Sequence, residues 1–302
     1  MGAVERIAVI GAGTMGMQIS ALAAAAGYQT TLYDLDPAAV DRAIARIDSE
    51  LLPAIVNGDQ LPEPTSVMEA RSRLVTADTL ETAVQGADVV VEAIKEDLQV
   101  KLGMFEQINR LAPNAILSTN SSSLPSRPLA DVVDHPDRLL NTHFFAPVWE
   151  RTMVELMTCG ETSEETFDTW TEIGERMGLV VARVHGESKG FIINRVWRAI
   201  KRESLRVVDE GRGTPEDVDR LFRLFFGAKT GPFQTMDLVG LDVVADIEKT
   251  YHAVATDPAD VPIKTLTDMV DAGALGQKSG SGFYDYPDPA CEDPDFLRPR
   301  KS

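Results

Sequence analysis

The segment Ile7-Ala8-Val9-Ile10-Gly11-Ala12-Gly13-Thr14-Met15-Gly16 passes from a short apolar run through a glycine-rich loop into a helical pattern. A G-x-G-x-x-G spacing between a strand and a helix is typical of dinucleotide-binding loops. Gly11 would allow the tight turn, Gly13 would let a pyrophosphate approach the backbone, and Gly16 would let the helix pack on the strand. The segment therefore predicts a nucleotide-binding strand–loop–helix unit.

A carboxylate follows at the distance expected for ribose recognition. Asp34 ends the next strand-like run, 18 positions after Gly16 (34 − 16), which is close to the expected ~20 positions. Its carboxylate would accept hydrogen bonds from both ribose hydroxyls and would repel a 2′-phosphate. The pattern favours NAD over NADP, with Thr14 and Met15 at the helix N-terminus that receives the phosphates. A loop whose glycines serve packing alone is the less favoured interpretation.

The first half of the chain alternates β-branched runs with helical patterns. Strands are expected at 6–10, 29–33, 73–76, 87–91 and 115–119, and helices at 15–26, 37–55 and 99–111. Further strand-like runs occupy 139–145, 153–157 and 179–182. This alternation predicts an α/β fold with a doubly wound, mostly parallel sheet of the Rossmann type.

The pattern changes after Val184. Residues 185–190 are polar and contain glycine, as linkers do, and a helical pattern covers 191–211. Thr214-Pro215 then has the form of a fresh helix start, with Thr as the cap and Pro at the first helical position. We expect an NAD-binding domain over 1–186 and an all-helical domain over 187–302, with the last dozen residues frayed. The length of 302 residues favours two domains.

The composition excludes several classes of protein. The net charge of −18 leaves no basic face for nucleic acid, and no apolar run is long enough to span a membrane. Cys159 and Cys291 are too few and too far apart for a disulfide framework or a metal site. Because no basic and apolar leader precedes the first strand-like run, a cytoplasmic protein is expected.

One of the four histidines stands out by its position. His143 lies in Asn141-Thr142-His143-Phe144-Phe145-Ala146-Pro147, at the end of an apolar run, where α/β sheets place their chemistry. A lone histidine is more often structural than catalytic, so this position alone leaves both roles open.

Seven short motifs in order supply the missing support. They are Asn120-Ser121-Ser122-Ser123-Leu124, His143-Phe144-Phe145, Val154-Glu155-Leu156, Gly190-Phe191-Ile192-Ile193-Asn194-Arg195, Gly231-Pro232-Phe233, Asp237-Leu238-Val239-Gly240-Leu241-Asp242 and Lys278-Ser279-Gly280-Ser281-Gly282-Phe283-Tyr284. Together with the glycine loop they resemble the L-3-hydroxyacyl-CoA dehydrogenase family, over nearly the whole chain to about Tyr286. The resemblance implies an NAD-dependent enzyme of fatty acid metabolism that oxidises a secondary alcohol.

The resemblance also implies roles for individual residues. His143 would be the general base, and Glu155 would orient its ring and stabilise its charged form. Ser122 and Asn194 would hold the substrate oxygen, with Ser122 also beside the cofactor. This assignment agrees with the chemistry, because loss of hydride from a carbinol carbon requires loss of the hydroxyl proton too, and imidazole suits that task. Glu96 and Lys101 are implied near the nicotinamide, and Lys278 is a weaker candidate on the cofactor side.

Three departures from the family pattern bear on the substrate. The family usually has asparagine at the position of Ala146 and proline at that of Lys189. Members that bind coenzyme A often carry lysines after the position of Asp34, whereas residues 50–59 of this chain contain no basic residue. Arginines could substitute as phosphate contacts, although surface charge is the favoured interpretation. These are Arg42, Arg46, Arg71 and Arg73.

Several alternatives therefore stay open. A CoA thioester is the favoured substrate, but an acyl-carrier-protein thioester or a free hydroxy acid of the gulonate or carnitine type would also fit. A non-catalytic NAD-binding protein is disfavoured because it has no need of a His–Glu pair. The family's helical domain forms a homodimer, and the apolar run 221–226 suits such an interface, although at least half of these residues are expected in the domain's own core.

Overall fold

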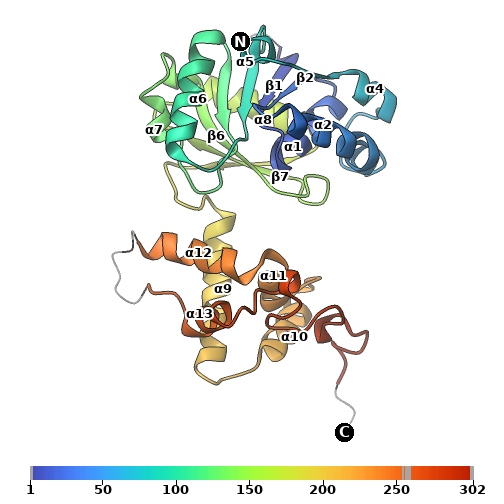
Figure 1. Ribbon diagram of the computed structural model, residues 1–302, viewed down its shortest axis with the longest axis vertical. Coiled ribbons are helices and arrows are strands. Elements are labelled where there is room, and N and C mark those ends of the chain that lie inside the picture. The colour runs from blue at the N-terminus through green and yellow to red at the C-terminus, as the bar shows by residue number, and fades with distance from the viewer. Residues whose placement is uncertain (1–2, 254, 256–259, 300–302) are drawn as a thin grey trace. The chain divides into compact units, whose positions relative to one another are not determined.

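The computed structural model describes residues 3–253, 255 and 260–299, and it divides into two compact units, Met1–Ile192 and Ile193–Ser302 (Figure 1). The first unit is a sheet covered by helices, and the named elements of the second are all helices. The predicted fold class, a Rossmann-type doubly wound sheet followed by a helical domain, is confirmed.

An eight-stranded sheet forms the centre of the first unit, in the order β3-β2-β1-β4-β5-β6-β7-β8. All neighbouring strands are parallel except β6 and β7, which are antiparallel. The order reverses between β1 and β4, so the carboxyl ends of these strands are where such sheets bind ligands. The strands are β1 (Arg6–Ile10), β2 (Gln29–Tyr33), β3 (Leu74–Thr76), β4 (Val89–Glu92), β5 (Ile116–Thr119), β6 (Leu139–Phe144), β7 (Met153–Thr158) and β8 (Val180–Val184).

Helices cover both faces of this sheet, as the alternation along β1 requires. Ile7 and Val9 belong to one buried cluster, and Ala8 and Ile10 to the other, because successive strand residues face opposite sides. The helices of this unit are α1 (Thr14–Ala25), α2 (Pro37–Arg46), η1 (Ile47–Leu51), α3 (Leu52–Val56), α4 (Val67–Ser72), α5 (Leu80–Val84), α6 (Leu98–Leu111), α7 (Arg127–Ala130), η2 (Pro136–Arg138) and α8 (Glu164–Arg176).

The helix expected at 37–55 contains one π-helical turn. Pro53 has no N–H for the usual helical hydrogen bond. Just before it, over η1, the helix widens so that the Leu52 N–H donates to the carbonyl of Ile47, five residues back. The helical course then continues through α3, so the predicted segment is helical but not regular.

The second unit is built from α9 (Ile193–Asp209), α10 (Pro215–Phe226), α11 (Pro232–Val239), α12 (Leu241–His252), α13 (Lys264–Asp271), η3 (Gln277–Ser279) and η4 (Ala290–Glu292). As predicted, Thr214 caps α10, and its hydroxyl accepts a hydrogen bond from the backbone N–H of Asp217 at 3.1 Å. The described residues of this unit form no strand longer than isolated bridges.

Two buried carboxylates join the motifs of the second unit. Asp219 accepts hydrogen bonds from the N–H groups of Phe233 and Gln234, both at 2.8 Å, and from the Tyr284 hydroxyl at 2.9 Å. Burial raises the pKa of this carboxyl above its usual range. A Cβ at Gly231 would lie 2.2 Å from the Asp219 carboxyl carbon, which explains the glycine of the Gly-Pro-Phe motif.

Asp237 anchors the C-terminal motif 278–284 through hydrogen bonds of the same kind. It accepts from the N–H groups of Phe283 and Tyr284, both at 2.9 Å, and from the Tyr286 hydroxyl at 3.2 Å. A Cβ at Gly282 would lie 2.3 Å from the Asp237 carboxylate. These motifs are therefore anchoring points of the helical unit.

Two predictions were wrong, one about where a helix begins and one about the C-terminal residues. The helix predicted from residue 191 begins at Ile193, because Phe191 adopts a positive φ of 54° that no α-helix contains. The last dozen residues are not frayed as far as they are described, since Cys291 and Phe296 are buried in the core of the second unit. Arg223 and Arg220 hold the carbonyls of these two residues, each at 2.7 Å.

Within the described residues, no helix has the length and apolar character needed to cross a membrane. Cys159 and Cys291 are both buried and unpaired.

Candidate active site

A histidine and a glutamate face each other across the antiparallel pair of strands. His143 of β6 and Glu155 of β7 are register partners, and His143 Nδ1 lies 2.9 Å from Glu155 Oε2. Each residue is only 4% exposed. The second carboxylate oxygen, Oε1, accepts the backbone N–H of Ile192 at 2.9 Å. The carboxylate is therefore fixed at both oxygens and holds the ring in one orientation.

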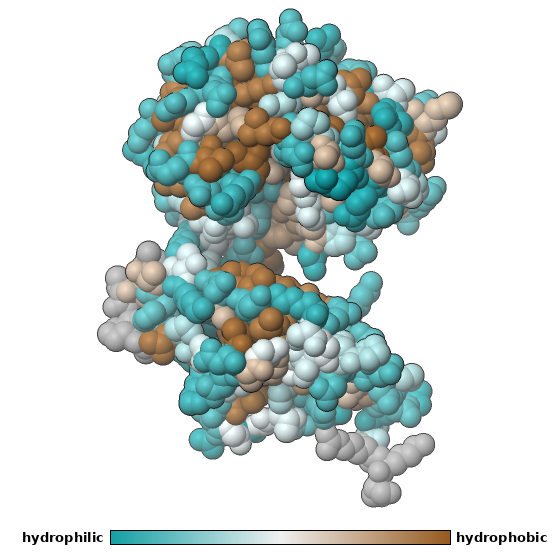
Figure 2. All heavy atoms as spheres, viewed as in Figure 1, coloured by the Kyte–Doolittle hydropathy of each residue, from teal (hydrophilic) through white to brown (hydrophobic). Residues whose placement is uncertain are grey.

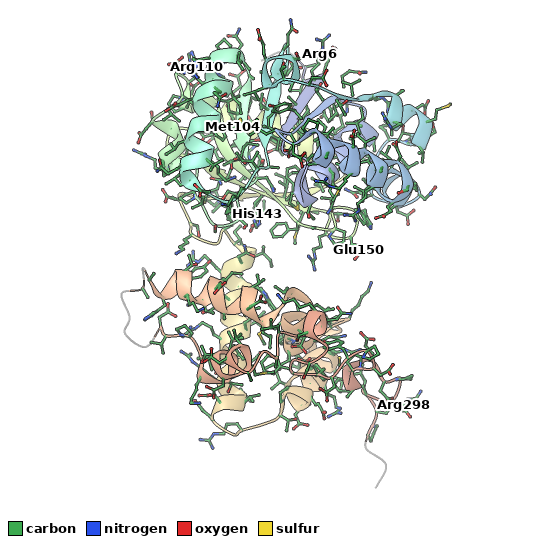
Figure 3. The ribbon with its side chains drawn as sticks, in the orientation of Figure 1. Arg6, Met104, Arg110, His143, Glu150 and Arg298 are labelled. Carbon is green, nitrogen blue, oxygen red and sulfur yellow. The ribbon has the colours of Figure 1, made fainter. Side chains whose placement is uncertain are left out.

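Two aromatic rings flank the imidazole. The ring centroid of Phe145 lies 4.1 Å from that of His143, and the centroid of Phe191 lies 4.7 Å away. Phe191 reaches this place from a left-handed turn, in which its N–H donates to the Ser188 carbonyl and the Ser188 hydroxyl donates to its own carbonyl. A non-glycine residue in this conformation is strained, and such strain gathers at functional sites. Figure 3 labels His143 at the end of β6.

This arrangement sets the protonation pattern of the ring. When Glu155 accepts a hydrogen bond from Nδ1–H, the neutral imidazole keeps its lone pair on Nε2. Nε2 can then accept a proton, and the buried carboxylate stabilises the cation that forms. The geometry of the His143–Glu155 pair is therefore compatible with general base chemistry.

The serine-rich loop after β5 is held by a glutamate. Glu96 Oε1 accepts from the Ser121 hydroxyl at 2.6 Å, the Ser123 hydroxyl at 2.8 Å and the Ser123 N–H at 3.0 Å. Burial alone would raise the pKa of Glu96, but these hydrogen bonds and the nearby Lys101 ammonium hold that pKa below its usual value. Ser122, between the two anchored serines, is exposed. Glu96 therefore presents Ser122 on a fixed loop.

The loop is also tied to the strand that carries the histidine. Asn120, at the start of the loop, accepts the backbone N–H of Phe144 through its side-chain oxygen at 2.9 Å. Because Phe144 directly follows His143, this bond keeps the loop and the ring in register.

Lys101 is fully buried rather than open to a ligand. Its ammonium lies 2.7 Å from Glu92 Oε1 and 3.5 Å from Glu96 Oε2. Glu92, at the end of β4, also accepts the Thr119 hydroxyl at 2.6 Å. A buried charge must be paired, and here the pair lies beneath Glu96 and its serine loop.

A cavity of about 540 Å³ opens at the carboxyl ends of the strands where the sheet order reverses. Seven of the residues predicted to bind the cofactor line it: Gly11, Gly13, Thr14, Met15, Asp34, Glu96 and Ser122. Asn120, Tyr33 and Ile94 line it as well and were not predicted. Gly16 and Lys101 are not among the lining residues.

The three loop glycines have different environments. Gly11 has a φ of 112°, and a Cβ there would lie 2.5 Å from the Ala93 carbonyl oxygen. A Cβ at Gly16 would lie 1.7 Å from the Gly11 carbonyl oxygen. At Gly13 a Cβ would meet nothing within 4 Å. Gly11 and Gly16 are therefore required by the fold, and Gly13 leaves open space at the N-terminus of α1.

Asp34 supports the same loop. Its Oδ2 accepts the backbone N–H of Ala12 at 2.7 Å, and its Oδ1 accepts that of Asp36 at 2.9 Å. A carboxylate has about four acceptor positions, so capacity remains for ribose hydroxyls. The cavity, the open position at Gly13 and this carboxylate fit a dinucleotide.

The arginines considered as CoA phosphate contacts are occupied by acidic neighbours. The pairs are Arg42–Asp36, Arg46–Glu50 and Arg71–Asp48, with N–O distances of 3.2, 3.1 and 2.6 Å. Arg73 donates to the carbonyl of Ala24 at 3.3 Å and to the Thr65 hydroxyl at 3.2 Å.

Two predicted site residues belong to the second unit. Asn194 is the second residue of α9. Lys278 donates to Asp242 Oδ2 at 2.6 Å, which fills at least one of its three donor positions.

Sequence reasoning missed the residues that act through their neighbours. Three such residues lie within the quoted motifs, but their contacts are visible only in the structure. Phe145 and Phe191 pack beside the His143 ring, and Asn120 accepts the N–H of Phe144. The burial of Glu92 could have been predicted from the sequence. A charged residue at the end of a Val-Val-Val run is expected to be buried with the strand and therefore to need a partner of opposite charge.

The fold and the site together define a dinucleotide-dependent dehydrogenase: a switch-point cavity over a glycine loop, a ribose-type carboxylate and a buried His–Glu pair. Residues 6–188 match the model of the 3-hydroxyacyl-CoA dehydrogenase NAD-binding domain, and residues 190–286 match that of the C-terminal domain. The chain belongs to the 3-hydroxyacyl-CoA dehydrogenase family. It is an NAD-dependent oxidoreductase that acts on a CH–OH group.

Relatives match along nearly the whole chain. A Bacillus subtilis protein described as a probable 3-hydroxybutyryl-CoA dehydrogenase is 36% identical, over 94% of this chain and 98% of its own. The human mitochondrial hydroxyacyl-coenzyme A dehydrogenase is 31% identical, over 94% and 91%. The crystal structure of (S)-3-hydroxybutyryl-CoA dehydrogenase from Ralstonia eutropha superposes with a TM-score of 0.86 at 29% identity, covering 95% of this chain and 100% of that one.

Proposed function

We propose that this enzyme oxidises an L-3-hydroxyacyl thioester, carried by coenzyme A, to the 3-oxoacyl thioester, with His143 as the general base. The observation that carries the proposal is the buried His143–Glu155 pair, 2.9 Å apart and directly opposite each other on β6 and β7. The names of the Bacillus subtilis and human relatives support the substrate class.

In the proposed mechanism, NAD when bound supplies the acceptor for the hydride that leaves the carbinol carbon. Nε2 of His143 takes the hydroxyl proton in the same conversion, so the alcohol loses two electrons and two hydrogens and becomes a ketone. Glu155 keeps the proton-accepting nitrogen on the substrate side and stabilises the imidazolium. Phe145 and Phe191 keep water from the ring faces, which strengthens the His–Glu interaction.

Ser122 and Asn194 would hold the substrate oxygen. Their side chains can donate hydrogen bonds to the oxygen that becomes a carbonyl, and would polarise it in the reverse, reducing direction. The fixed position of the loop around Ser122 supports this role.

NAD would be held by the glycine loop and Asp34, with Glu96 and Lys101 ordering the nicotinamide end. Lys278 would lie on the cofactor side, as the family resemblance implies.

A free hydroxy acid is the second candidate substrate. The observation in its favour is that the arginines after Asp34 already pair with carboxylates, so coenzyme A phosphates would find few free cations there. Two solved structures of the same fold, each 28% identical, are those of a diketoreductase and of a dehydrogenase of a pyridine carboxylic acid, with TM-scores of 0.81 and 0.73.

Steady-state kinetics with NAD distinguish the two candidates. The formation of NADH is followed with 3-hydroxybutyryl-CoA and, in parallel, with free 3-hydroxybutyrate, gulonate and carnitine. Turnover of the CoA ester with a kcat/KM at least tenfold above that of each free acid is expected. A free acid that is turned over better than the ester would overturn the thioester assignment and leave the dehydrogenase chemistry in place.

We further propose that the helical domain, residues 187–302, carries a homodimer interface. On α10, Leu221, Leu224, Phe225 and Phe226 are exposed, Phe225 by 83%, so the expectation that at least half of the run 221–226 lies in the core was wrong. Figure 2 shows hydrophobic residues gathered on the visible face of the second unit near α11 and α12, where Val239 and Val243 are exposed. Apolar patches of this kind mark interaction sites. The molar mass from light scattering, with Phe225→Glu as the disrupting variant, tests the dimer.

The buried, unpaired thiols support a reducing, cytoplasmic setting for the enzyme.

A further inference from the structure

The side-chain charges that line the cavity over the glycine loop are mostly negative. Asp34 and Glu96 contribute carboxylates, and Lys95 is the one basic residue among the described residues of the lining. The remaining lining consists of glycines, apolar side chains, hydroxyl groups and the amide of Asn120. Any positive side-chain charge that the cavity offers to a ligand therefore comes from Lys95.

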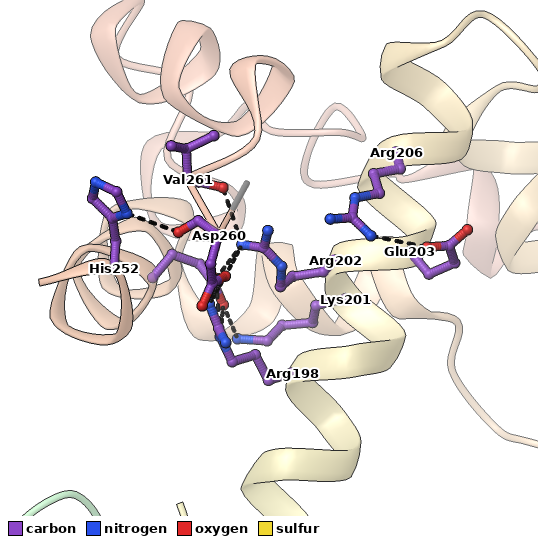
Figure 4. A network of polar contacts seen from close by, with 9 residues as sticks. Arg198, Lys201, Arg202, Glu203, Arg206, His252, Asp260 and Val261 are labelled. Carbon is purple, nitrogen blue, oxygen red and sulfur yellow. Dashed lines mark hydrogen bonds and ion pairs between the residues drawn. The ribbon is translucent and has the colours of Figure 1, made fainter. Parts of the chain in front are cut away.

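Within the part of the chain that the structure describes, no ion pair or hydrogen bond engages the Lys95 ammonium, and the residue is exposed. Other cations of the chain are already neutralised. Lys101 lies 2.7 Å from Glu92 Oε1, and in the helical unit Arg198 Nη2 lies 2.6 Å from Asp260 Oδ1 (Figure 4). Lys95 thus keeps its three donors for a ligand.

The backbone that carries Lys95 is fixed on both sides. Directly before it, the N–H of Ile94 donates to the buried Glu92 carboxylate at 2.7 Å. Directly beyond it, the Lys95 carbonyl accepts the N–H of Asp97 at 2.8 Å, and Asp97 is the N-cap of α6. The side chain therefore extends from an ordered base, which lowers the entropy that is lost when it binds a ligand.

The same segment touches the glycine loop. A Cβ at Gly11 would lie 2.5 Å from the carbonyl oxygen of Ala93 and 3.1 Å from the backbone nitrogen of Ile94. Lys95 follows Ile94 directly, so its side chain begins one residue from this contact. A pyrophosphate received at Gly13 and the N-terminus of α1 would lie beside the segment that carries Lys95.

Electrostatics gives this cation its importance. The net charge of the protein is −18, and a dinucleotide carries a negative charge on each of its phosphates. The net charge and the carboxylates of Asp34 and Glu96 all oppose the approach of such an anion. The N–H groups of the glycine loop and of α1 contribute only partial positive charges. A full positive charge on Lys95 would offset the repulsion at the phosphates.

We propose that Lys95 is the counter-charge of the NAD pyrophosphate. Its ammonium donates to the phosphate oxygens, while the glycine loop and the N-terminus of α1 supply backbone donors. The inference rests on the proposed placement of NAD over the glycine loop and does not depend on the identity of the substrate. Lys95 is thereby a cofactor-binding residue and leaves the chemical step to the His143–Glu155 pair.

Equilibrium binding tests this contact without turnover. Calorimetric titration gives the Kd for NAD and for ADP-ribose, which both contain the pyrophosphate, and for adenosine, which lacks it. In Lys95→Met the Kd for NAD and ADP-ribose is expected to rise about tenfold at low ionic strength, because a charge-assisted hydrogen bond is lost. The Kd for adenosine should not change. Lys95→Arg keeps the charge and should stay within about threefold of the wild-type Kd for NAD.

Salt should remove the difference between Lys95→Met and the wild-type enzyme. The ratio of their Kd values for NAD is expected to approach about one at roughly 1 M salt, where the Debye length is about 3 Å. Arg110→Met is the matched control, because it deletes one positive charge from the same unit. Arg110 lies in the last turn of α6, whereas Val100, in the first turn, lines the cavity (Figure 3). This variant should keep the Kd for NAD within about twofold of the wild-type value at both salt concentrations.

The outcomes separate this inference from the placement of NAD. Gly13→Ala, whose methyl group would occupy the open position over the loop, reports on the placement itself. If Gly13→Ala weakens NAD binding and Lys95→Met changes the Kd by less than about twofold at low salt, the pyrophosphate contact is overturned and the placement stands. An equal loss for adenosine and ADP-ribose in Lys95→Met would also overturn the contact. If neither variant weakens NAD binding, the placement and this inference both fail.

Discussion

His143 and Glu155 are related twice, as register partners of two neighbouring strands and through a contact between their side chains. They are opposite residues of the only antiparallel strand pair in the described sheet, and their side chains meet at 2.9 Å. Because the other oxygen of Glu155 accepts the Ile192 N–H, the same carboxylate also fixes the chain just before α9. The antiparallel pairing of β6 and β7 thus places the imidazole and the carboxylate side by side, as the proposed base and its partner require.

Glu155→Gln should separate these two contacts. The amide keeps the size of the side chain and an oxygen for Ile192, but it removes the charge that stabilises the imidazolium. We expect kcat to fall roughly 10²- to 10³-fold, with the KM for NAD unchanged. Glu161→Gln, at an exposed glutamate three residues beyond β7, is the control. A kcat within threefold of the wild-type value would show that the carboxylate is not needed for catalysis.

The loop glycines predict a contrast between two alanine variants. Gly13→Ala adds a methyl group that meets no protein atom within 4 Å, whereas Gly16→Ala drives one into the Gly11 carbonyl. Gly13→Ala should keep the melting temperature within about 2 °C, since no contact is lost, and raise the Kd for NAD at least tenfold. Gly16→Ala should lose stability and NAD binding together. Equal melting temperatures for the two variants would contradict this distinction.

Asp34 should govern the choice between NAD and NADP. Asp34→Ala removes the hydrogen bond to Ala12 and the negative charge that repels a 2′-phosphate. We expect the NAD-to-NADP ratio of kcat/KM to fall at least tenfold, which corresponds to about 1.4 kcal/mol. Asp41→Ala, at an exposed position of α2, is the matched control. An unchanged ratio in Asp34→Ala would remove Asp34 from cofactor selection.

Asp219 should matter for stability rather than chemistry. Its replacement by alanine leaves two backbone N–H groups and the Tyr284 hydroxyl without their acceptor. Unfolding in urea should show a loss of roughly 2–4 kcal/mol, whereas Asp268→Ala, at an exposed residue of α13, should change stability by less than about 0.5 kcal/mol. A loss below 1 kcal/mol in Asp219→Ala would mean that the motif is not an anchor.

Much of the first unit could be predicted because its signals are local. The apolar run 7–10 predicts a strand from its own composition, and the spacing of the glycines and of Asp34 from this strand predicts the nucleotide-binding loop. The parallel pairing of most strands follows from the alternation of strands and helices, because parallel strands require crossover connections.

The rest depends on contacts between residues distant in sequence. Lys101 lies in an amphipathic helical pattern that gives no sign of burial, yet its side chain is buried against Glu92, nine residues away and at the end of a strand. Arg198 and Arg202 likewise lie on the buried face of α9 because Glu248, some fifty residues later, receives them. A periodic pattern predicts which side chains share one face of a helix. It does not show whether an oppositely charged residue elsewhere in the chain packs against that face.

The exposed residues of α10 illustrate the opposite failure. A run rich in Leu and Phe predicts a core, because apolar side chains usually find one within their own domain. Phe225 and Phe226 instead remain exposed in the single chain. An apolar run suits a domain core and a subunit interface equally well, so the sequence pattern alone does not distinguish the two.

The most direct test of the central claim is the turnover of 3-hydroxybutyryl-CoA by His143→Asn, measured beside the Kd for NAD of the same preparation. If His143 is the general base, kcat should fall about 10²- to 10⁴-fold, while the Kd for NAD stays within twofold of the wild-type value because the cavity over the glycine loop is untouched. A variant that binds NAD normally and retains more than a tenth of the wild-type kcat would contradict the assignment of His143 as the base.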